Sequence, residues 1–515
     1  MLVKTFGSAI QGIVATTVTV EVSVEQGINF ILVGLPDNAV KESHERISSA
    51  LRHNGYKIPG KKIVINMAPA DTRKEGSAYD LTIAIGILAA SEQIKAEELD
   101  KYLIMGELSL DGTLNPIKGA LPITLQAKKE GFKGIILPKS NAKEAAIVQN
   151  FEVLGASNII EVINFINGTS SIDRTIIRVE EEFKKGLEKY DLDFADVKGQ
   201  ESIKRAMEIA AAGSHNILLI GPPGSGKTML AKRLPSILPP LTLEESLETT
   251  KIHSVAGKMS ANQSIVSIRP FRNPHHTISD TALVGGGVYP QPGEISLAHN
   301  GVLFLDELPE FKRNVLEVLR QPMEERVITI SRTKFTAQYP ASFMLVAAMN
   351  PCPCGYYNHP TVACTCASGQ VNRYLSKISG PLLDRIDIQV EVIPVEFKEL
   401  SEKRTGEPSS VIRERVINAR KIQQERFKDY ADIHCNAQMN EKMLSKYAVL
   451  DDSSLNLLRV GMERLKLSAR AYNRILKVAR TIADLESSEN IQSKHIAEAI
   501  GYRNLDRDDW AERGK

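Results

Sequence analysis

The chain has 515 residues, a length that predicts two to four domains rather than a single core. Hydrophobic residues make up 43% and charged residues 24%, as in globular proteins, and no apolar run is long enough to cross a membrane. The net charge of +2 excludes a polycation, so any nucleic-acid contact requires local arginines and lysines. The apolar start lacks a signal-peptide pattern, which predicts a cytoplasmic protein where disulfides are rare.

The first predicted domain covers residues 1–168. Within it, KIVINMAP and GIILP are typical of buried strands, and EGSAYDLTIAIGILAASEQ is typical of a helix with an apolar face. The composition then becomes polar and charged, which predicts a linker over residues 169–190.

Two further domains are predicted after the linker. Residues 191–400 form an α/β unit whose apolar strands include NILLIG, GVLFLDE and FMLVAAMNP. The polar break EKRTGEPSS begins the last domain, residues 401–515, which we expect to be helical. The expected fold class is therefore α/β and multidomain.

A phosphate-binding loop is predicted where NILLIGPPGSGKTML passes from a strand through a glycine-rich turn into a helix. The backbone N–H groups of such a turn and the helix dipole bind phosphates. We expect Lys227 to reach the β- and γ-phosphates of ATP and Thr228 to bind Mg²⁺. The predicted nucleotide-binding residues are Gly221, Pro222, Pro223, Gly224, Ser225, Gly226, Lys227 and Thr228.

Acidic and amide side chains end the next two predicted strands. GVLFLDE leads to Asp306, which we expect to bind Mg²⁺ through water, and to Glu307, which we expect to polarise the attacking water. The following strand ends at Asn350, which is suited to orient that water or to contact the γ-phosphate, the role called sensor 1. The alternative for Asn350 is a side chain that caps the next turn.

Two arginines later in the chain are candidates for catalysis. Arg385 lies on a loop before a strand, from which it can enter a neighbouring subunit's site as an arginine finger. The alternative is a surface ion pair of Arg385 with Asp384 or Asp387. Arg470 lies in the first turn of the last long predicted helix, where sensor 2 arginines are found.

In this order, the motifs GPPGSGKT, LFLDELPEF, AAMNPCPCG, GPLLDRIDI and SARAYNRILKVARTIADL closely resemble those of the ComM/YifB group of Mg-chelatase-like AAA+ ATPases. The resemblance covers essentially the full length. It implies an AAA+ αβα core with a P-loop, a C-terminal helical lid, and a homo-oligomeric ring that we expect to be a hexamer. It also implies a motor that uses ATP and Mg²⁺ on single-stranded or branched DNA, because the best-understood relatives drive branch migration in natural transformation. The alternative is a magnesium-chelatase-like or protein-remodelling ATPase that acts on a protein partner.

Two stretches bear on DNA binding. VITISRTKFTAQYPASFMLV predicts a hairpin, and in the related helicases a hairpin here enters the ring's pore. Arg332 and Lys334 would lie near its tip and contact DNA phosphates, although an ordinary solvated hairpin is the alternative. The stretch from residue 271 to 301 resembles an insertion of the same clade. For its His275 and His276 we favour a loop role over metal ligation, because adjacent side chains rarely point the same way.

The N-terminal domain resembles the Lon protease domain in TRKEGSAYDLTIAIGIL and the segment that begins GELSLDG. The family's nucleophilic serine corresponds to Ala78 and its base lysine to Leu121. Ser77 and Lys118 lie close by in sequence, but a serine hydroxyl without a positioned base is a poor nucleophile. We therefore expect a non-catalytic, Lon-protease-like α+β domain, with peptidase activity through Ser77 and Lys118 as the alternative.

Four of the chain's 5 cysteines fall within the loop 351–366 that follows the sensor 1 strand. Two CxC pairs that meet across a turn present four thiolates, which suit a closed, structural, tetrahedral Zn²⁺ site. His359 is a further candidate ligand, and four reduced thiols without a metal are the alternative. The predicted ligands are Cys352, Cys354, Cys364 and Cys366.

Overall fold

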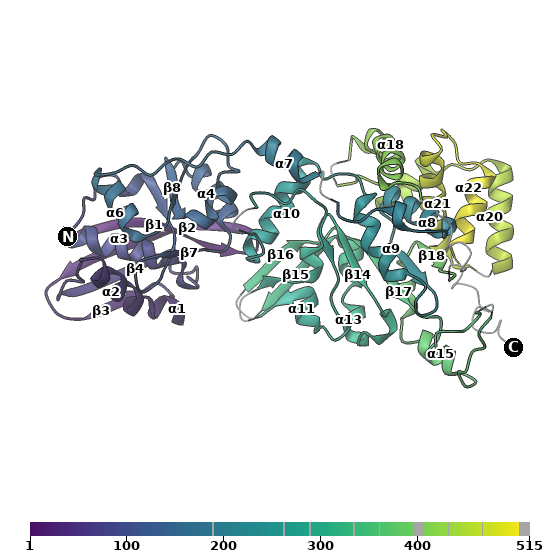
Figure 1. Cartoon of the computed structure of the whole chain (residues 1–515), viewed down its shortest axis with the longest axis horizontal. Coiled ribbons are helices and arrows are strands. Elements are labelled where there is room, and N and C mark those ends of the chain that lie inside the picture. Colours follow the sequence, from purple (N-terminus) through teal and green to yellow (C-terminus); the bar gives the residue numbers. More distant parts are fainter. Residues whose placement is uncertain are drawn as a thin grey trace.

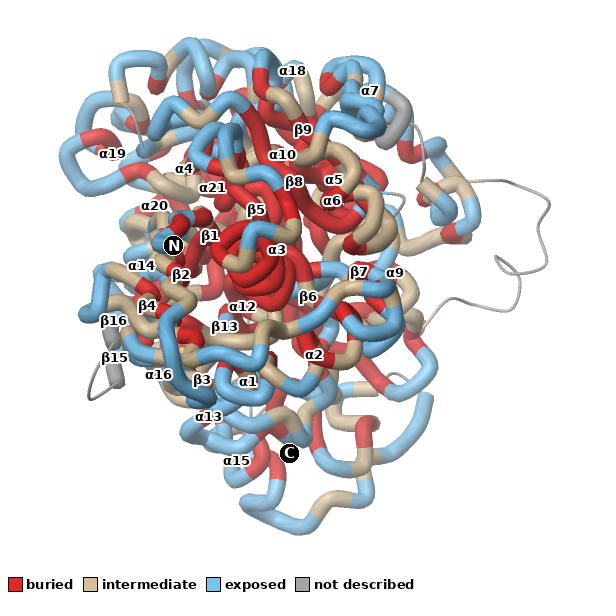
Figure 2. The backbone as a smooth tube through the Cα atoms, turned by 90° about the vertical axis from the view of Figure 1, so that its left-hand side faces the viewer, coloured by how far each residue is buried: buried red, intermediate tan, exposed pale blue. Residues whose placement is uncertain are grey.

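The computed structural model describes residues 1–187, 190–260, 263–287, 290–332, 335–359, 361–394, 406–430, 432–465 and 467–503. It shows an elongated molecule in which one sheet lies at the N-terminal end, a second sheet lies in the middle, and a group of helices lies beyond it (Figure 1). Buried residues concentrate along the strands and the helices that cover them (Figure 2). Among the described residues, no helix has the length and apolar character needed to cross a membrane.

The N-terminal sheet has seven strands in the order β3-β4-β2-β1-β5-β8-β9. The pairs β1–β2 and β2–β4 are antiparallel, and the remaining neighbours are parallel. The predicted strands KIVINMAP and GIILP are confirmed as β4 and β8. The strands of this domain are β1 (Leu2–Gln11), β2 (Val14–Glu25), β3 (Phe30–Val33), β4 (Lys62–Ala68), β5 (Tyr102–Ile104), β8 (Gly134–Pro138) and β9 (Glu152–Ala156), with β6 (Glu107–Leu108) and β7 (Leu114–Asn115) paired separately.

A fully buried helix, α3 (Asp80–Ala90), packs against β1 and β2 of this sheet. Apolar residues lie on every side of it, and every residue from Asp80 to Ala90 is buried, as its red tube in Figure 2 shows. The predicted helix in this region is thereby confirmed. The other helices are α1 (Asn38–Lys41), α2 (Ser43–His53), α4 (Ala120–Lys129), α5 (Lys139–Ala145) and α6 (Ile159–Asn167), with the 3-10 turns η1 (Ser77–Tyr79) and η2 (Leu99–Lys101).

The predicted linker, residues 169–190, contains a helix that the sequence did not lead us to expect, α7 (Val179–Leu187). Three glutamates occupy its first turn, where negative charge is stabilised by the helix dipole. Val179 is buried in the core of the N-terminal domain. Part of this segment is therefore regular structure that is attached to the first domain.

The central sheet has five parallel strands in the order β11-β14-β17-β10-β18. Alternate residues of its strands enter two different hydrophobic clusters, one on each face, as expected for a sheet between two helical layers. The strands are β10 (Ile217–Ile220), β11 (Phe271–Arg272), β14 (Val302–Leu305), β17 (Met344–Met349) and β18 (Ile388–Glu391), and they confirm the three strands predicted here.

Helices and short turns connect these strands. The helices α9 (Lys227–Arg233) and α10 (Leu243–Val255) lie between β10 and β11, and α8 (Glu201–Gly213) precedes β10. The predicted hairpin is confirmed as the antiparallel pair β15 (Val327–Arg332) and β16 (Phe335–Pro340). The remaining elements are η3 (Phe194–Asp196), η4 (Leu234–Ser236), α11 (Asp280–Val284), β12 (Gly285–Gly286), β13 (Gln291–Pro292), α12 (Glu294–Leu297), η5 (Leu308–Glu310), α13 (Arg313–Glu317), α14 (Arg320–Glu325), α15 (Gln370–Leu375) and α16 (Gly380–Leu383).

The described part of the C-terminal region is helical, as predicted. Its long helix α21 (Ala469–Leu485) is capped by the Ser468 hydroxyl, which accepts from the N–H of Ala471, and it packs against α8 of the central domain. The other helices are α18 (Ser409–Phe427), η6 (Asn436–Gln438), α19 (Glu441–Tyr447), α20 (Asp452–Leu465) and α22 (Ser493–Gly501). The fold is thus a mixed α/β architecture with a parallel sheet and a helical C-terminal region.

The first two domains pack together through α4 and α10. The hydroxyl of Ser254 donates to the buried carboxylate of Glu144, which also accepts from the N–H of Leu121 at 2.9 Å. Burial raises the pKa of Glu144 despite these hydrogen bonds. The two domains are therefore joined by a buried polar contact that both domains complete.

Candidate functional site

The candidate site lies at the carboxyl end of the central sheet. Because β10, β14 and β17 are parallel neighbours, the residues that follow them meet at the same end. The glycine-rich loop follows β10, Asp306 and Glu307 follow β14, and Asn350 follows β17. The strand order therefore brings together three segments that are far apart in the sequence.

Lys227 lies at the centre of this end of the sheet. Its Nζ donates to the carbonyl oxygens of Gly221 at 2.7 Å and Pro222 at 2.8 Å, and to Oδ1 of Asn350 at 3.2 Å. Burial lowers the pKa of Lys227, and the nearby carboxylate of Asp306 partly opposes this effect. The predicted P-loop lysine and sensor 1 amide are thus in direct contact, and Asn350 is not simply a cap of the next turn.

Thr228 and Asp306 form the second contact of the site. The Thr228 hydroxyl donates to Oδ2 of Asp306 at 2.6 Å, and the other oxygen of Asp306 accepts from the N–H of Glu307 at 3.0 Å. A hydroxyl and a carboxylate side by side are hard oxygen ligands, the type that Mg²⁺ prefers. These two residues therefore fit the magnesium role that the sequence predicts for them.

Glu307 adopts a left-handed backbone conformation with φ of +53°, which is uncommon for a residue other than glycine. Its side chain is 58% exposed, and Oε2 lies 3.2 Å from Nδ1 of His276. The ring of His276 in turn lies beside those of His275 and Phe311. The carboxylate predicted to be catalytic thus contacts a histidine.

Sequence reasoning missed this role of His276 and assigned it only to a loop. The pairing follows from strand order, since β11 lies beside β14, and the segment after β11 therefore reaches the residues after β14. His275 contacts Thr277 instead, with Nδ1 2.9 Å from its hydroxyl. The two rings nevertheless lie side by side, with centroids 4.1 Å apart, so the expectation that these adjacent side chains point in different directions is wrong.

Arg385 lies at the opposite, amino end of the sheet. Its carbonyl accepts from Nδ2 of Asn216, which directly precedes β10, at 3.0 Å. Arg385 is therefore separated from the P-loop of its own chain by the length of β10, which is about 13 Å at about 3.3 Å per residue. Its guanidinium donates to the Pro381 carbonyl at 2.7 Å and pairs with Glu324 at 2.6 Å.

Arg385 thus forms an ion pair within its own chain, as the alternative predicted, but its partner is Glu324 rather than Asp384 or Asp387. Asp387 is fully buried and pairs with Arg474 at 3.0 Å, whereas Asp384 pairs with Arg470 at 2.7 Å. Burial alone would raise the pKa of Asp387, but Arg474 and then His215 hold it well below its usual range. Arg470 thus lies beside the loop of Arg385 rather than at the P-loop of the same chain, which spacing along the sequence does not reveal.

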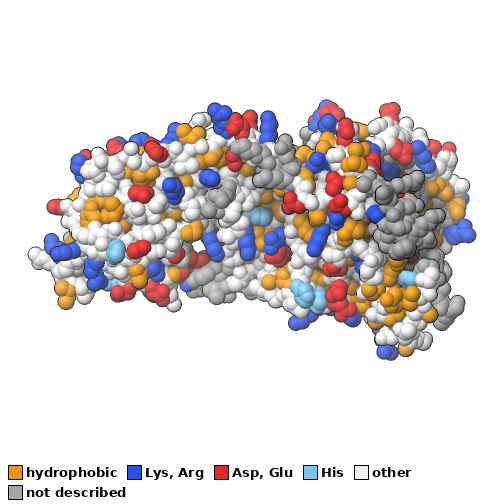
Figure 3. Space-filling view, viewed as in Figure 1, with side chains coloured by type: hydrophobic (Ala, Val, Ile, Leu, Met, Phe, Trp, Pro, Cys, Tyr) orange, Lys and Arg blue, Asp and Glu red, His pale blue; other side chains and the backbone are white. Residues whose placement is uncertain are grey.

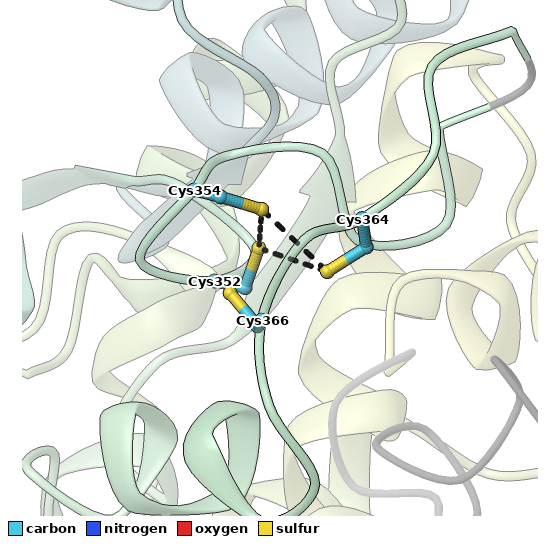
Figure 4. A group of neighbouring side chains, drawn as sticks. All are labelled: Cys352, Cys354, Cys364 and Cys366. Atoms are coloured by element: carbon cyan, nitrogen blue, oxygen red, sulfur yellow. Dashed lines mark hydrogen bonds between the residues drawn. The ribbon is translucent and has the colours of Figure 1, made fainter.

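The four cysteines predicted to bind a metal converge (Figure 4). The sulfur of Cys352 lies 3.3 Å from that of Cys354 and 3.8 Å from that of Cys364, and all four sulfurs fall within 4.8 Å of one another. All are free thiols, and Cys352 is buried. The fourth member of the group is Cys366.

The surroundings of these thiols favour the ionised form at one position. Burial alone would raise the pKa of Cys354, but backbone N–H groups of Tyr356 and Thr365 donate to its sulfur and lower the pKa below its usual range. His359, the spare candidate ligand, instead accepts through Nδ1 from the N–H of Val362 at 3.0 Å. The ligand set that the described residues offer is therefore four cysteine sulfurs.

In the N-terminal domain, Ser77 and Lys118 have different partners. The Ser77 hydroxyl donates to the carboxylate of Glu107, while the side chain of Lys118 packs against Gly257 of the central domain. Lys118 is thus not placed as the base of Ser77, and the Ser77–Lys118 pair considered as the alternative is not formed. The geometry supports a non-catalytic domain.

Two residues, Arg332 and Lys334, are predicted to contact DNA. Lys334 lies outside the described residues, and of Arg332 only the backbone, at the end of β15, is described. On the face shown in Figure 3, lysines and arginines are interspersed with acidic side chains. This distribution agrees with the small net charge and with contacts made by a few local residues.

Comparison with known proteins gives matches along most of the chain. The family models described as subunit ChlI of Mg-chelatase, magnesium chelatase subunit ChlI, and its C-terminal part match residues 20–141, 193–400 and 406–503. Competence protein ComM of Haemophilus influenzae is 45% identical over 507 residues, which cover 98% of this chain and 97% of the relative. YifB of Escherichia coli is 45% identical over 501 residues, 96% of each chain. Lon protease 2 of Bacillus subtilis is 30% identical over 128 residues, which cover only 24% of this chain and 22% of the relative.

Proposed function

The chain belongs to the ComM/YifB group of Mg-chelatase-like proteins, and from this membership we propose that it is a cytoplasmic AAA+ motor that hydrolyses ATP and acts on single-stranded or branched DNA. One relative is named as a competence protein, and the motif resemblance implies branch migration during natural transformation. The mixed α/β fold with a parallel sheet and helical C-terminal region is consistent with an AAA+-like ATPase. The convergence of Lys227, Thr228, Asp306 and Asn350 at one end of the sheet carries the proposal.

Each residue of this site has a role in the proposed hydrolysis. Lys227 binds the β- and γ-phosphates, and its present contacts with backbone carbonyls give way to phosphate oxygens. Thr228 and Asp306 hold Mg²⁺, which offsets the charge of the phosphates when it is bound. Glu307 polarises the attacking water, and Asn350 orients it beside Lys227.

The position of Arg385 supports catalysis that is shared between subunits. It is separated from its own P-loop by the length of β10, yet it lies beside Arg470 on a cavity at the surface. We propose that both arginines reach the nucleotide of a neighbouring subunit in a homo-oligomeric ring, a hexamer by resemblance. A cation supplied in this way stabilises the charge that develops on the transferred phosphoryl group.

Two further assignments complete the proposal. The hairpin β15–β16 lines the pore, where Arg332 and Lys334 contact DNA phosphates. Structural Zn²⁺ is bound by Cys352, Cys354 and the two remaining cysteines of their group.

The experiment that tests this function is ATP turnover without DNA, with single-stranded DNA and with a four-way DNA junction. We expect DNA to stimulate turnover, Lys227→Ala to abolish it, and the double variant Arg332→Ala, Lys334→Ala to lose the stimulation. Turnover that no DNA stimulates would contradict action on DNA and favour the alternative, a chelatase-like ATPase that acts on a protein partner.

A further inference from the structure

The segment that carries the cysteines shows no helix or strand over its described residues, 350–359 and 361–369. It follows β17 and continues to α15, and in its second half, residues 361–368, no side chain is buried. A connection of this length without helix or strand is uncommon in a compact domain and cannot be held by hydrophobic contacts of its own. The exposed second half of the segment therefore lacks buried side chains that would fix its conformation.

The beginning of the same segment is packed directly on the P-loop. Gly221 donates its N–H to the carbonyl of Met349 at 3.1 Å, and Lys227 donates to Oδ1 of Asn350 at 3.2 Å. Gly355 is buried with a φ of +87°, and a β-carbon there would lie 2.4 Å from Cδ of Pro223. Residues 349–355 therefore form one wall of the phosphate-binding loop.

The two cysteines of the first pair, Cys352 and Cys354, lie inside this wall. A tetrahedral zinc site with Zn–S bonds of about 2.3 Å has sulfurs about 3.8 Å apart. The recorded separations are 3.3, 3.5 and 3.8 Å, which need only a small expansion to admit the ion. The second pair, Cys364 and Cys366, comes from the exposed half of the loop and would tie it to the first.

We propose that one Zn²⁺, bound by these four thiolates, holds residues 349–355 against the P-loop, so that ATP affinity depends on occupancy of a metal site outside the nucleotide site. This inference rests on the proposed function only in that the P-loop binds ATP. Metal removal would free the loop, and Gly355 would no longer be held on Pro223. Zinc binding is thereby coupled to the conformation of the nucleotide site.

The test uses the full-length protein, purified without added metal, and measures zinc content together with equilibrium binding of a fluorescent ATP analogue in Mg²⁺ buffer without DNA. We expect about one zinc per chain and an affinity that falls about tenfold when a mercurial thiol reagent and a chelator remove the metal. Reduction and added Zn²⁺ should restore the affinity. Circular dichroism establishes that the metal-free chain remains folded.

If the metal-free chain unfolds, the variant Gly355→Ala still tests the proposal. It places a methyl group against Pro223, so we expect zinc to be retained and ATP affinity to fall. The matched control is Gly131→Ala, which has a similar φ of +86° but meets nothing within 4 Å, so it shares the backbone strain alone. Absence of zinc, unchanged affinity in a folded metal-free chain, or equal affinities of the two alanine variants would each overturn the proposal. Because the binding assay contains no DNA, its result does not depend on whether DNA stimulates ATP turnover.

Discussion

The substitution Glu307→Gln separates ATP binding from ATP hydrolysis. The glutamine keeps the size of the side chain and can occupy the same left-handed backbone position, but its amide cannot polarise water as a carboxylate does. General bases contribute about 10²–10⁴-fold to rate, so turnover should fall by this factor, equivalent to about 3–5 kcal/mol of barrier. Because the side chain is 58% exposed, the unfolding free energy should change by less than about 0.5 kcal/mol.

The assay pairs ATP turnover at saturating ATP with equilibrium binding of a fluorescent ATP analogue. We expect the affinity of Glu307→Gln to stay within about twofold of the unmodified chain, since phosphate binding belongs to the P-loop. The matched control is Glu310→Gln, which changes an exposed carboxylate three positions later that pairs with Lys377 at 3.3 Å, and this variant should turn over normally. Near-normal turnover by Glu307→Gln, or an equal loss in Glu310→Gln, would refute the assignment.

Two other substitutions test contacts that support the site. His276→Ala removes the partner of the Glu307 carboxylate. An ion pair this exposed contributes about 0.2–1 kcal/mol, so its loss should raise DNA-independent turnover by at most about fivefold. A fall in turnover would show that His276 assists catalysis instead. Asp387→Asn removes the fully buried charge that pairs with the part-buried Arg474, and it should lower the unfolding free energy by about 3 kcal/mol at pH 7, the lower end of the range for a broken buried pair. Because the folded pKa of Asp387 is depressed, its stabilisation is present above the ordinary carboxyl pKa of about 3.9 and is lost as the pH falls below it. Urea unfolding should therefore show a constant difference between the two chains from about pH 5 to 7 that shrinks below about pH 4, and a difference that grows on acidification would contradict this account.

The sequence predicted the parts of the site that depend on local pattern. A strand, a glycine-rich turn and a helix in succession specify the P-loop, and apolar runs ending in Asp306 or Asn350 specify neighbouring strands. Contacts that depend on the order of the strands in the sheet could not be predicted, because that order does not follow from local sequence pattern. His276 meets Glu307 only because β11 lies beside β14, and Arg470 meets Asp384 only because the C-terminal helices pack at the amino end of the sheet.

The helix α7 shows a different limit of sequence reasoning. Its short, highly charged sequence has the composition of a linker, and one buried contact through Val179 attaches it to the first domain. The packing of Gly355 on Pro223 was likewise invisible, because a glycine in a loop is equally compatible with a free turn.

The central claim is that ATP is hydrolysed between subunits of an assembly acting on DNA, and mixing two inactive chains tests it most directly. Lys227→Ala lacks its own phosphate-binding lysine, and Arg385→Ala lacks the residue proposed to act on a neighbour's nucleotide. In mixed assemblies, some interfaces pair an intact P-loop with an intact arginine, so mixing in the presence of single-stranded DNA should restore part of the turnover. Normal turnover by Arg385→Ala alone, or no recovery when the two chains demonstrably assemble together, would contradict the claim.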